Sequence, residues 1–146
     1  MEALQDLLKG QQYKKVKFKI TKTNHLLIKA KINDVLGSFI LDTGASNTCI
    51  GFESVNFFEL TTSDSENKAA GAGALNMETL VSRDNVMQIG NWKKPDFALI
   101  VFDMSHVNEA LISHKAKPVQ GIIGADVLIS GQAIIDYYNL YLYLKM

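Results

Sequence analysis

The chain has 146 residues, of which 47% are hydrophobic, so it is long enough to form one domain around a single buried core. Its 15 basic and 15 acidic side chains balance, and this net charge argues against nucleic acid and against an anionic membrane as partners. No apolar run has the length of a signal peptide or of a membrane span, and Cys49 is the only cysteine, so a cytoplasmic protein without an internal disulfide is expected.

The start of the chain predicts a helix followed by a strand. Leu4, Leu7 and Leu8 recur at helical spacing, so an amphipathic helix is expected over residues 1–10. Over residues 16–20, apolar side chains alternate with lysines, which is the pattern of a strand with one solvated face. The lysines are interpreted as that solvated face and not as a patch for nucleic acid.

The next segment predicts a β-hairpin. Residues 26–32 continue the alternation, residues 33–34 are the turn formers Asn and Asp, and residues 35–41 form the returning strand. A tight turn between two antiparallel strands sets their register. The residue that follows the second strand is therefore expected to have a defined place.

That residue is an acid. Asp42 is succeeded by Thr43 and Gly44, and glycine allows a sharp turn because it can adopt a positive φ. A carboxylate at the end of a rigid strand can be held by backbone N–H groups while its surroundings tune its pKa, as general acid–base catalysis requires. The alternative interpretation is an ordinary surface turn, in which Asp and Gly are also common.

The middle of the chain predicts further strands. One or two helical turns are expected within residues 52–60, and a polar loop follows over residues 61–67. A long strand is expected over residues 77–89. The turn formers of residues 90–95 then lead into an apolar strand over residues 97–102, which completes a second hairpin.

A second helix is expected near residues 104–115. Asp103 or Ser105 can cap its N-terminus, and Pro118 prevents it from continuing. Apolar residues recur at helical spacing within this segment. One face of the helix is therefore expected to pack against the strands.

The histidines and the cysteine predict no metal site. His106 and His114 are eight residues apart, which does not match the i, i+4 spacing of two metal ligands on a helix, and His25 lies far upstream. Cys49 stands in an apolar setting. It is interpreted as a small core residue and not as a nucleophile.

A second glycine-containing motif occupies residues 121–128, where an apolar strand ends at Gly124 and enters a short helix. The last strand, residues 140–145, places leucines on one face and tyrosines on the other. Such a strand is either central or lies at a contact between molecules. Coverage of the tyrosine face by the N-terminal helix is an equally open alternative.

In their order and separation, residues 39–46 and 121–128 resemble the retropepsin-like aspartic proteases, the single-domain family that includes the retroviral proteases. The resemblance extends from about Leu26 to the C-terminus. It implies a mostly β, closed, barrel-like acid-protease fold with a flap hairpin and one short helix after the second motif. The helix near residues 104–115 is an addition to the minimal retroviral plan, and residues 1–146 would form a single retropepsin-like domain.

The resemblance also assigns the site. Asp42 is the implied catalytic residue, and a homodimer with two copies of Asp42 on its two-fold axis would supply the second carboxylate, because the chain has only one Asp-Thr-Gly. Asp126, on the expected short helix, is interpreted as a local cap or pairing residue. The implied support for the active site comes from Thr43, Gly44, Ala45, Ile123 and Gly124. The implied flap consists of Ala70, Gly71, Ala72 and Gly73, without the tyrosine of the retroviral members.

The predicted function is therefore that of an aspartic endopeptidase, which hydrolyses a peptide or protein substrate without a metal or organic cofactor. Two carboxylates close together share one proton, so one can activate water while the other protonates the carbonyl oxygen. A non-catalytic peptide-binding or dimerisation module of the same fold is the main alternative. A sugar hydrolase would pair Asp42 with another acid of the same chain, but the sequence shows no placed partner for it.

Overall fold

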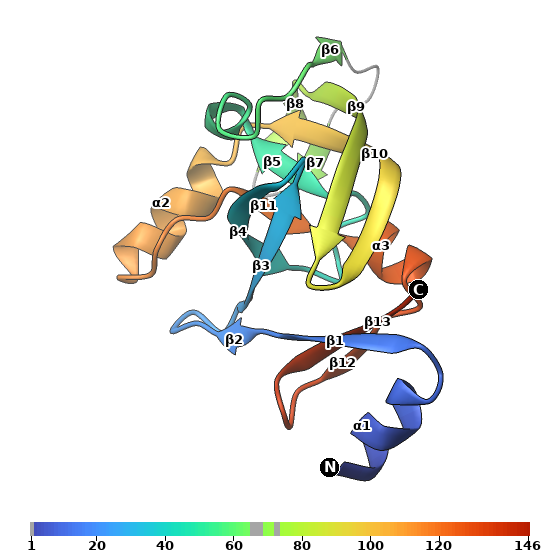
Figure 1. Ribbon diagram of the computed structural model, residues 1–146. Coiled ribbons are helices and arrows are strands. Elements are labelled where there is room, and N and C mark those ends of the chain that lie inside the picture. Colours follow the sequence, from blue (N-terminus) through green and yellow to red (C-terminus); the bar gives the residue numbers. More distant parts are fainter. Residues whose placement is uncertain (1, 65–68, 72–73) are drawn as a thin grey trace.

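The computed structural model describes residues 2–64, 69–71 and 74–146, with the side chains of residues 4–64 and 78–146. Strands dominate it, and the largest sheet closes on itself (Figure 1). Its strands follow the order β3-β4-β11-β5-β10-β9, and β9 pairs again with β3, so these six strands form a barrel. Their bounds are Leu26–Ile32 for β3, Val35–Leu41 for β4, Gly121–Ile123 for β11, Cys49–Gly51 for β5, Trp92–Phe102 for β10 and Leu80–Ile89 for β9.

The expected first hairpin is confirmed. Asn33 and Asp34 both have positive φ, at 51° and 69°, which is the geometry of the two-residue turns that match the twist of a hairpin. In β3, Ile28 and Ile32 are buried while Lys29 between them is exposed. The alternation read from the sequence therefore marks an inner and an outer face of the barrel.

The second hairpin turns earlier than expected. Its turn is at Gly90 and Asn91, and β10 begins at Trp92 and continues through Pro95, although residues 90–95 were predicted to be the turn. Trp92 is only 3% exposed, and its indole N–H donates to the carbonyl of Lys145 at 3.2 Å. Burial of this ring and its hydrogen bond to the C-terminal strand outweigh the local turn preference.

Residues 16–20 form two strands and not one. β1 (Tyr13–Lys17) pairs with β13 (Tyr141–Lys145), whereas β2 (Lys19–Ile20) pairs with β3 of the barrel. Phe18 lies between them, is 1% exposed and packs in the barrel core. The chain thus passes from one sheet to the other at a buried aromatic side chain, which the simple alternation does not reveal.

The C-terminal strand is central in a three-stranded sheet with the order β1-β13-β12, where β12 is Ile134–Asp136. Leu142 and Leu144 belong to the barrel core. The opposite face carries Tyr143, which is 2% exposed, and α1 (Glu2–Lys9) lies on the side of this sheet turned away from the barrel (Figure 1). The predicted N-terminal helix is confirmed, and of the alternatives for the last strand the central position is the one observed.

Two more helices and several short strands complete the described chain. The additional helix is confirmed as α2, and it covers a second apolar cluster that includes Met104 and Leu111. Ser63 and Asp64 form a strand against β9, although residues 61–67 were predicted to be a loop, and the strand expected over 77–89 is divided by residues 78–79. These elements are α2 (Ser105–Ser113), α3 (Ala125–Ser130), the 3-10 turn η1 (Phe52–Ser54), β6 (Ser63–Asp64), β7 (Ala69–Gly71) and β8 (Ala74–Met77).

Candidate active site

Asp42 is the first residue after β4, and its side chain is exposed. The strand ahead of it is anchored by Phe39 and Leu41, which are 0% and 4% exposed. The backbone N–H of Asp42 donates to the carbonyl of Ile123 at 2.9 Å, and Ala45 N–H donates to the carbonyl of Asp42 at 3.2 Å. The backbone of Asp42 is therefore fixed by the neighbouring strand β11 and by its own turn.

The carboxylate of Asp42 is held from one side. Gly44 N–H donates to Oδ1 at 2.9 Å, and a Cβ on Gly44 would stand only 3.3 Å from the same oxygen. Within the described residues no other group donates a hydrogen bond to this carboxylate. Thr43 beside it is exposed. The backbone thus orients one oxygen and leaves the remaining capacity for water, substrate or another molecule.

The backbone of the second motif packs directly against the strand before Asp42 and the loop after it. β11 lies between β4, with which it is parallel, and β5, with which it is antiparallel. A Cβ on Gly121 would collide with the carbonyl oxygen of Cys49, and one on Gly124 would come within 2.7 Å of the carbonyl oxygen of Ala45. Ala125 N–H donates to that oxygen of Ala45 at 2.7 Å. Only glycine allows the backbones to approach this closely.

A buried polar link joins the two motifs. Thr48, which is 0% exposed, donates its backbone N–H to Asp126 Oδ2 at 2.9 Å and its hydroxyl to Asp126 Oδ1 at 2.7 Å. The hydroxyl oxygen of Thr48 accepts the N–H of Gly124 at 3.1 Å, and Asp126 Oδ1 also accepts from Val127 N–H at 2.8 Å. Asp126 lies in the first turn of α3, whose N-cap is Gly124, so instead of acting as the cap it accepts from the helix N–H of Val127 and holds the loop that follows Asp42. Sequence spacing did not indicate Thr48, because 78 positions separate it from Asp126.

Cys49 is placed as a packing residue. Its thiol donates to the carbonyl of Asn47 at 3.2 Å, and it packs with the cluster under α2. Burial, together with the negative charges of Asp126 and Asp42, raises the pKa of the thiol to about 12. Since the thiolate is the reactive form, Cys49 is a poor nucleophile near neutral pH.

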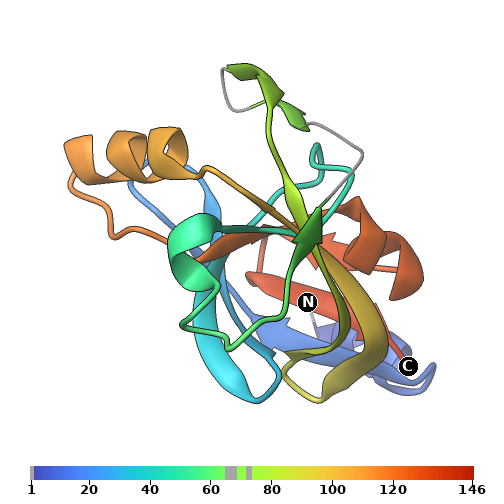
Figure 2. The same ribbon diagram turned by 90° about the horizontal axis from the view of Figure 1, so that it is seen from above.

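The remaining predicted site residues lie in two places. Ile123 is fully buried at the end of β11, next to Gly124 and behind the turn of Asp42. Ala70 and Gly71 lie in β7, which pairs with β8 in a separate two-stranded sheet, whereas Ala72 and Gly73 are outside the described residues. Seen from above, the β7–β8 hairpin projects from the body of the molecule (Figure 2).

The three histidines are brought together although the sequence separates them. His25, His106 and His114 all line one cavity of about 480 Å³ between α2 and the turn before β3. His114 Nδ1 is 2.9 Å from the carbonyl of Ala110, and His25 Nδ1 is 2.7 Å from the hydroxyl of Thr23. Among the residues that the structure describes, no group of His, Cys, Asp and Glu is arranged to hold a metal ion.

Within the same described residues, no helix has the length and apolar character to cross a membrane.

Comparison with known families gives one match over most of the chain. A family model described as aspartyl protease matches residues 28–127, which is 100 of the 146 residues. This range contains residues 39–46 of the first motif and 121–127 of the second, and it ends within α3. No curated protein matches the chain significantly.

Solved structures share the fold. A retropepsin-like aspartic protease from Rickettsia conorii aligns with a TM-score of 0.56 at 17% identity, covering 90% of this chain and 90% of that one. EIAV protease, solved with the inhibitor HBY-793, gives 0.59 at 19% identity over 81% and 98%. The retroviral protease-like domain of Ddi1 from Leishmania major gives 0.56 at 20% identity over 82% and 87%. The resemblance found in the sequence, and the barrel-like acid-protease fold that it implied, are confirmed.

Proposed function

We propose, from the premise that this chain belongs to the aspartyl protease family, that it is an aspartic endopeptidase that acts as a homodimer. The observation that carries the proposal is the exposed carboxylate of Asp42 at the end of β4, oriented by the N–H of Gly44 at 2.9 Å. In this proposal residues 1–146 act as one retropepsin-like domain. A lone, inert Cys49 suits the reducing cytoplasm, which is the compartment we propose.

The second carboxylate is proposed to come from a second copy of the chain. Asp126 lies within the second motif, and both of its carboxylate oxygens accept hydrogen bonds from Thr48. Asp136 lies in the terminal sheet, where its carboxylate accepts from the N–H groups of Tyr138 and Asn139. Neither acid is available to share a proton with Asp42, whereas a two-fold axis beside Asp42 supplies an identical partner.

The proposed reaction uses water held between the two copies of Asp42. The ionised carboxylate takes a proton from the water as its oxygen bonds to the peptide carbonyl carbon, and the protonated carboxyl donates to the carbonyl oxygen. In the second step a hydroxyl of the tetrahedral intermediate returns its proton to the carboxylate that protonated the carbonyl oxygen, the C–N bond breaks, and the other carboxyl gives the proton it took from water to the amine nitrogen. Gly44 fixes each carboxylate, and Thr43 is proposed to make a hydrogen bond across the axis.

The flap is proposed to close over an extended substrate. The β7–β8 hairpin pairs with no strand of the barrel in the described part of the chain, so its edges can add a strand of peptide between the flap and the site. Ala70 and Gly71 have no bulky side chain to obstruct that approach, and Ala72 and Gly73 complete the small-residue stretch in the sequence. Ala45, Ile123 and Gly124 would form the supporting wall behind Asp42.

Cleavage of a peptide library by wild type, Asp42→Asn and the control Asp64→Asn tests the chemistry. Asp64 is an exposed acid in β6, so its variant controls for the loss of one charge. Wild type and Asp64→Asn should cleave, and Asp42→Asn should lose at least about a thousandfold in rate, because it removes the shared acid and base. Cleavage by Asp42→Asn at the wild-type rate contradicts the proposal. Peptide binding without cleavage by wild type favours the non-catalytic module.

Mixing experiments test the homodimer separately. Wild type equilibrated with a ninefold excess of Asp42→Asn should retain about one tenth of its activity, because random pairing places most active chains beside an inactive partner. Asp64→Asn in the same excess should not inhibit. Activity that is unchanged by excess Asp42→Asn, together with a monomeric mass at the assay concentration, would show that one chain is sufficient.

A further inference from the structure

Charge is strongly segregated along this chain, although its sum is zero. Between Leu7 and Asn33 there are eight lysines and no acid, whereas residues 42–78 contain six acids and a single lysine. The lysines of the first segment are all exposed; they are Lys9, Lys14, Lys15, Lys17, Lys19, Lys22, Lys29 and Lys31. The net charge therefore says little about the local field at either end of the molecule.

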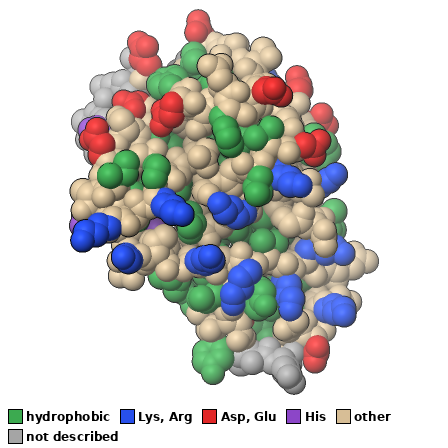
Figure 3. Space-filling model, turned by 60° about the vertical axis from the view of Figure 1, so that its left-hand side comes forward, with side chains coloured by type: hydrophobic (Ala, Val, Ile, Leu, Met, Phe, Trp, Pro, Cys, Tyr) green, Lys and Arg blue, Asp and Glu red, His purple; other side chains and the backbone are tan. Residues whose placement is uncertain are grey.

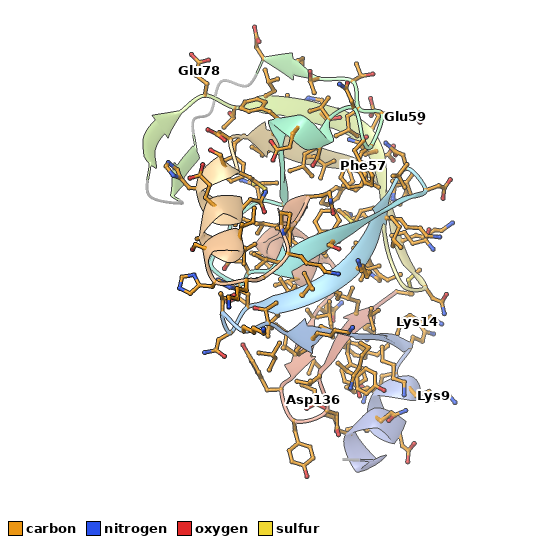
Figure 4. The ribbon with its side chains drawn as sticks, turned by 90° about the vertical axis from the view of Figure 1, so that its left-hand side faces the viewer. Lys9, Lys14, Phe57, Glu59, Glu78 and Asp136 are labelled. Carbon is orange, nitrogen blue, oxygen red and sulfur yellow. The ribbon has the colours of Figure 1, made fainter. Side chains whose placement is uncertain are left out.

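The fold gathers lysines of β2, β3 and β10 on one face of the barrel. Lys19 pairs with Leu27 in register, Leu27 shares the outer face of β3 with Lys29 and Lys31, and Lys31 and Lys93 both pair with Gln88 of β9. Residues paired across strands present their side chains on the same face. Figure 3 shows the result as a band of basic side chains across the lower half of the molecule, with acidic side chains gathered above it. In Figure 4, Glu59 and Glu78 lie at one end and Lys9 and Lys14 at the other, where Asp136 also lies.

These lysines are not neutralised by carboxylates. Lys29 Nζ donates to the hydroxyl of Ser38 at 2.6 Å, and Lys17 Nζ donates to the carbonyl of Asn139 at 2.7 Å, so both partners are neutral. No lysine of the band makes an ion pair within the residues that the structure describes. Asp136 pairs with Tyr141, as Lys17 does, so the acid shares a face of the terminal sheet with Lys17, but its carboxylate hydrogen-bonds to the turn that follows it and not to Lys17.

Two exposed tyrosines lie in the turn that Lys17 binds. Tyr137 is 64% exposed and Tyr138 is 81% exposed, in the turn between β12 and β13. Phe18, which lies between β1 and β2, packs edge-on against Tyr137 with ring centroids 6.3 Å apart, and Lys17 binds the same turn at Asn139. Large aromatic rings exposed beside unpaired lysines offer a flat stacking surface next to positive charge.

We propose that this basic surface, formed by Lys17, Lys19, Lys29, Lys31 and Lys93 with Tyr137 and Tyr138, binds single-stranded nucleic acid. Lysines contact phosphates as point charges, and aromatic rings stack on any base, so binding has little sequence preference. A single strand fits better than a duplex because only unpaired bases can stack on the tyrosines. This proposal departs from the expectation drawn from the net charge, because it rests on where the charges lie and not on their sum.

Fluorescence anisotropy with a labelled 20-nucleotide thymidine strand tests the inference on the full chain. Micromolar binding is expected at 50 mM salt, and contacts from five lysines should weaken it about a hundredfold at 200 mM salt. Lys31→Glu should weaken binding about tenfold. Arg83→Glu, the same charge reversal on an exposed residue of β9 that shares a cavity with Glu59 and Asp84, should leave binding unchanged.

The tyrosines separate nucleic acid from other polyanions. Tyr138→Ala should weaken binding of the single strand about tenfold and leave binding of heparin unchanged, and Tyr138→Phe should restore the single-strand affinity because it keeps the ring. Circular dichroism verifies that each variant is folded. The proposal is overturned by the absence of binding at 50 mM salt, by equal losses in Lys31→Glu and Arg83→Glu, or by tighter binding to vesicles of anionic lipid than to the oligonucleotide.

Discussion

Two regions of the molecule join distant parts of the chain by different contacts. One is the region beside Asp42 where β11 pairs between β4 and β5, called the crossing below, and the other is the terminal sheet of β1, β12 and β13. At the crossing, backbone touches backbone at two glycines, and a buried Thr48–Asp126 pair closes the gap. In the terminal sheet, β13 pairs along its backbone with β1 and β12, and surface side chains add further contacts, with Lys15 and Lys17 each 4.7 Å from the centre of the Tyr141 ring.

The difference predicts how each region responds to substitution. Two backbones in contact have no side chain that can move aside, so a small addition shifts a strand and with it Asp42. Contacts between long side chains at a surface adjust by rotation and are partly replaced by water. The crossing should therefore fail abruptly, and the terminal sheet should weaken by degrees.

Gly121→Ala tests the most rigid point of the crossing. The new Cβ would meet the carbonyl oxygen of Cys49 and the ring of Phe39, so we expect a loss of about 3 kcal/mol in the free energy of unfolding. Gly10→Ala is the matched control, because its nearest atom would be 3.6 Å away. Urea unfolding followed by circular dichroism measures both variants, and equal stability of the two would remove the argument for hard backbone contact.

Thr48→Val tests the polar link at the same crossing. Valine keeps the shape but leaves Asp126 Oδ1 and the N–H of Gly124 without the hydroxyl, so we expect a loss of about 2 kcal/mol. Thr61→Val, at an exposed position before β6, should change the stability by less than about 0.5 kcal/mol. If thermal unfolding shows the same shift for both variants, the link does not hold the motifs together.

Asp136→Asn tests the turn of the terminal sheet. The backbone N–H of Asn139 is the main cause that lowers the pKa of this carboxyl, helped by Asn139 Nδ2 and by Tyr138 N–H. A lowered pKa means that the contribution to stability is present above the unfolded value of about 3.9 and is lost as the pH falls through the folded value. We expect a lower melting temperature for the variant at pH 7 and a difference that shrinks as the pH falls below about 3.9. A difference that does not change between pH 7 and acid pH, or one equal to that of exposed Asp96→Asn, would assign the effect to something other than the charge.

Lys15→Met tests the most adaptable contact. It removes one of two cations over the Tyr141 ring while Lys17 remains, so we expect a loss of about 0.5 kcal/mol. Lys22→Met, in the turn before β3, provides a control with the same change of charge. A loss above about 2 kcal/mol in the free energy of unfolding of Lys15→Met, measured by urea unfolding, would show that the terminal sheet tolerates substitution no better than the crossing does.

Local rules predicted the elements that depend on near neighbours in the chain. The hairpin that ends at Asp42 follows from alternation and from Asn33-Asp34, whose positive φ values suit the turn. The helices over residues 2–9 and 105–113 follow from spacing that repeats within a few residues. Local rules failed at Phe18 and Trp92. Both rings are buried in a core cluster that includes Leu142 and Leu144 of the C-terminal strand, and Trp92 also hydrogen-bonds to Lys145 of that strand, so contacts far along the chain decide their positions.

The two glycine motifs determined which family this chain would resemble and, through that resemblance, the mostly β fold and the carboxylate to examine, since motifs depend on residue type and short spacing. Only the tertiary structure decided that Thr48 would hold Asp126, that three histidines would share a cavity, and that lysines of β2, β3 and β10 would meet on one surface. The reason is physical: backbone preferences act over a few residues, whereas hydrogen bonds, packing and electrostatic fields act through space between segments that folding brings together.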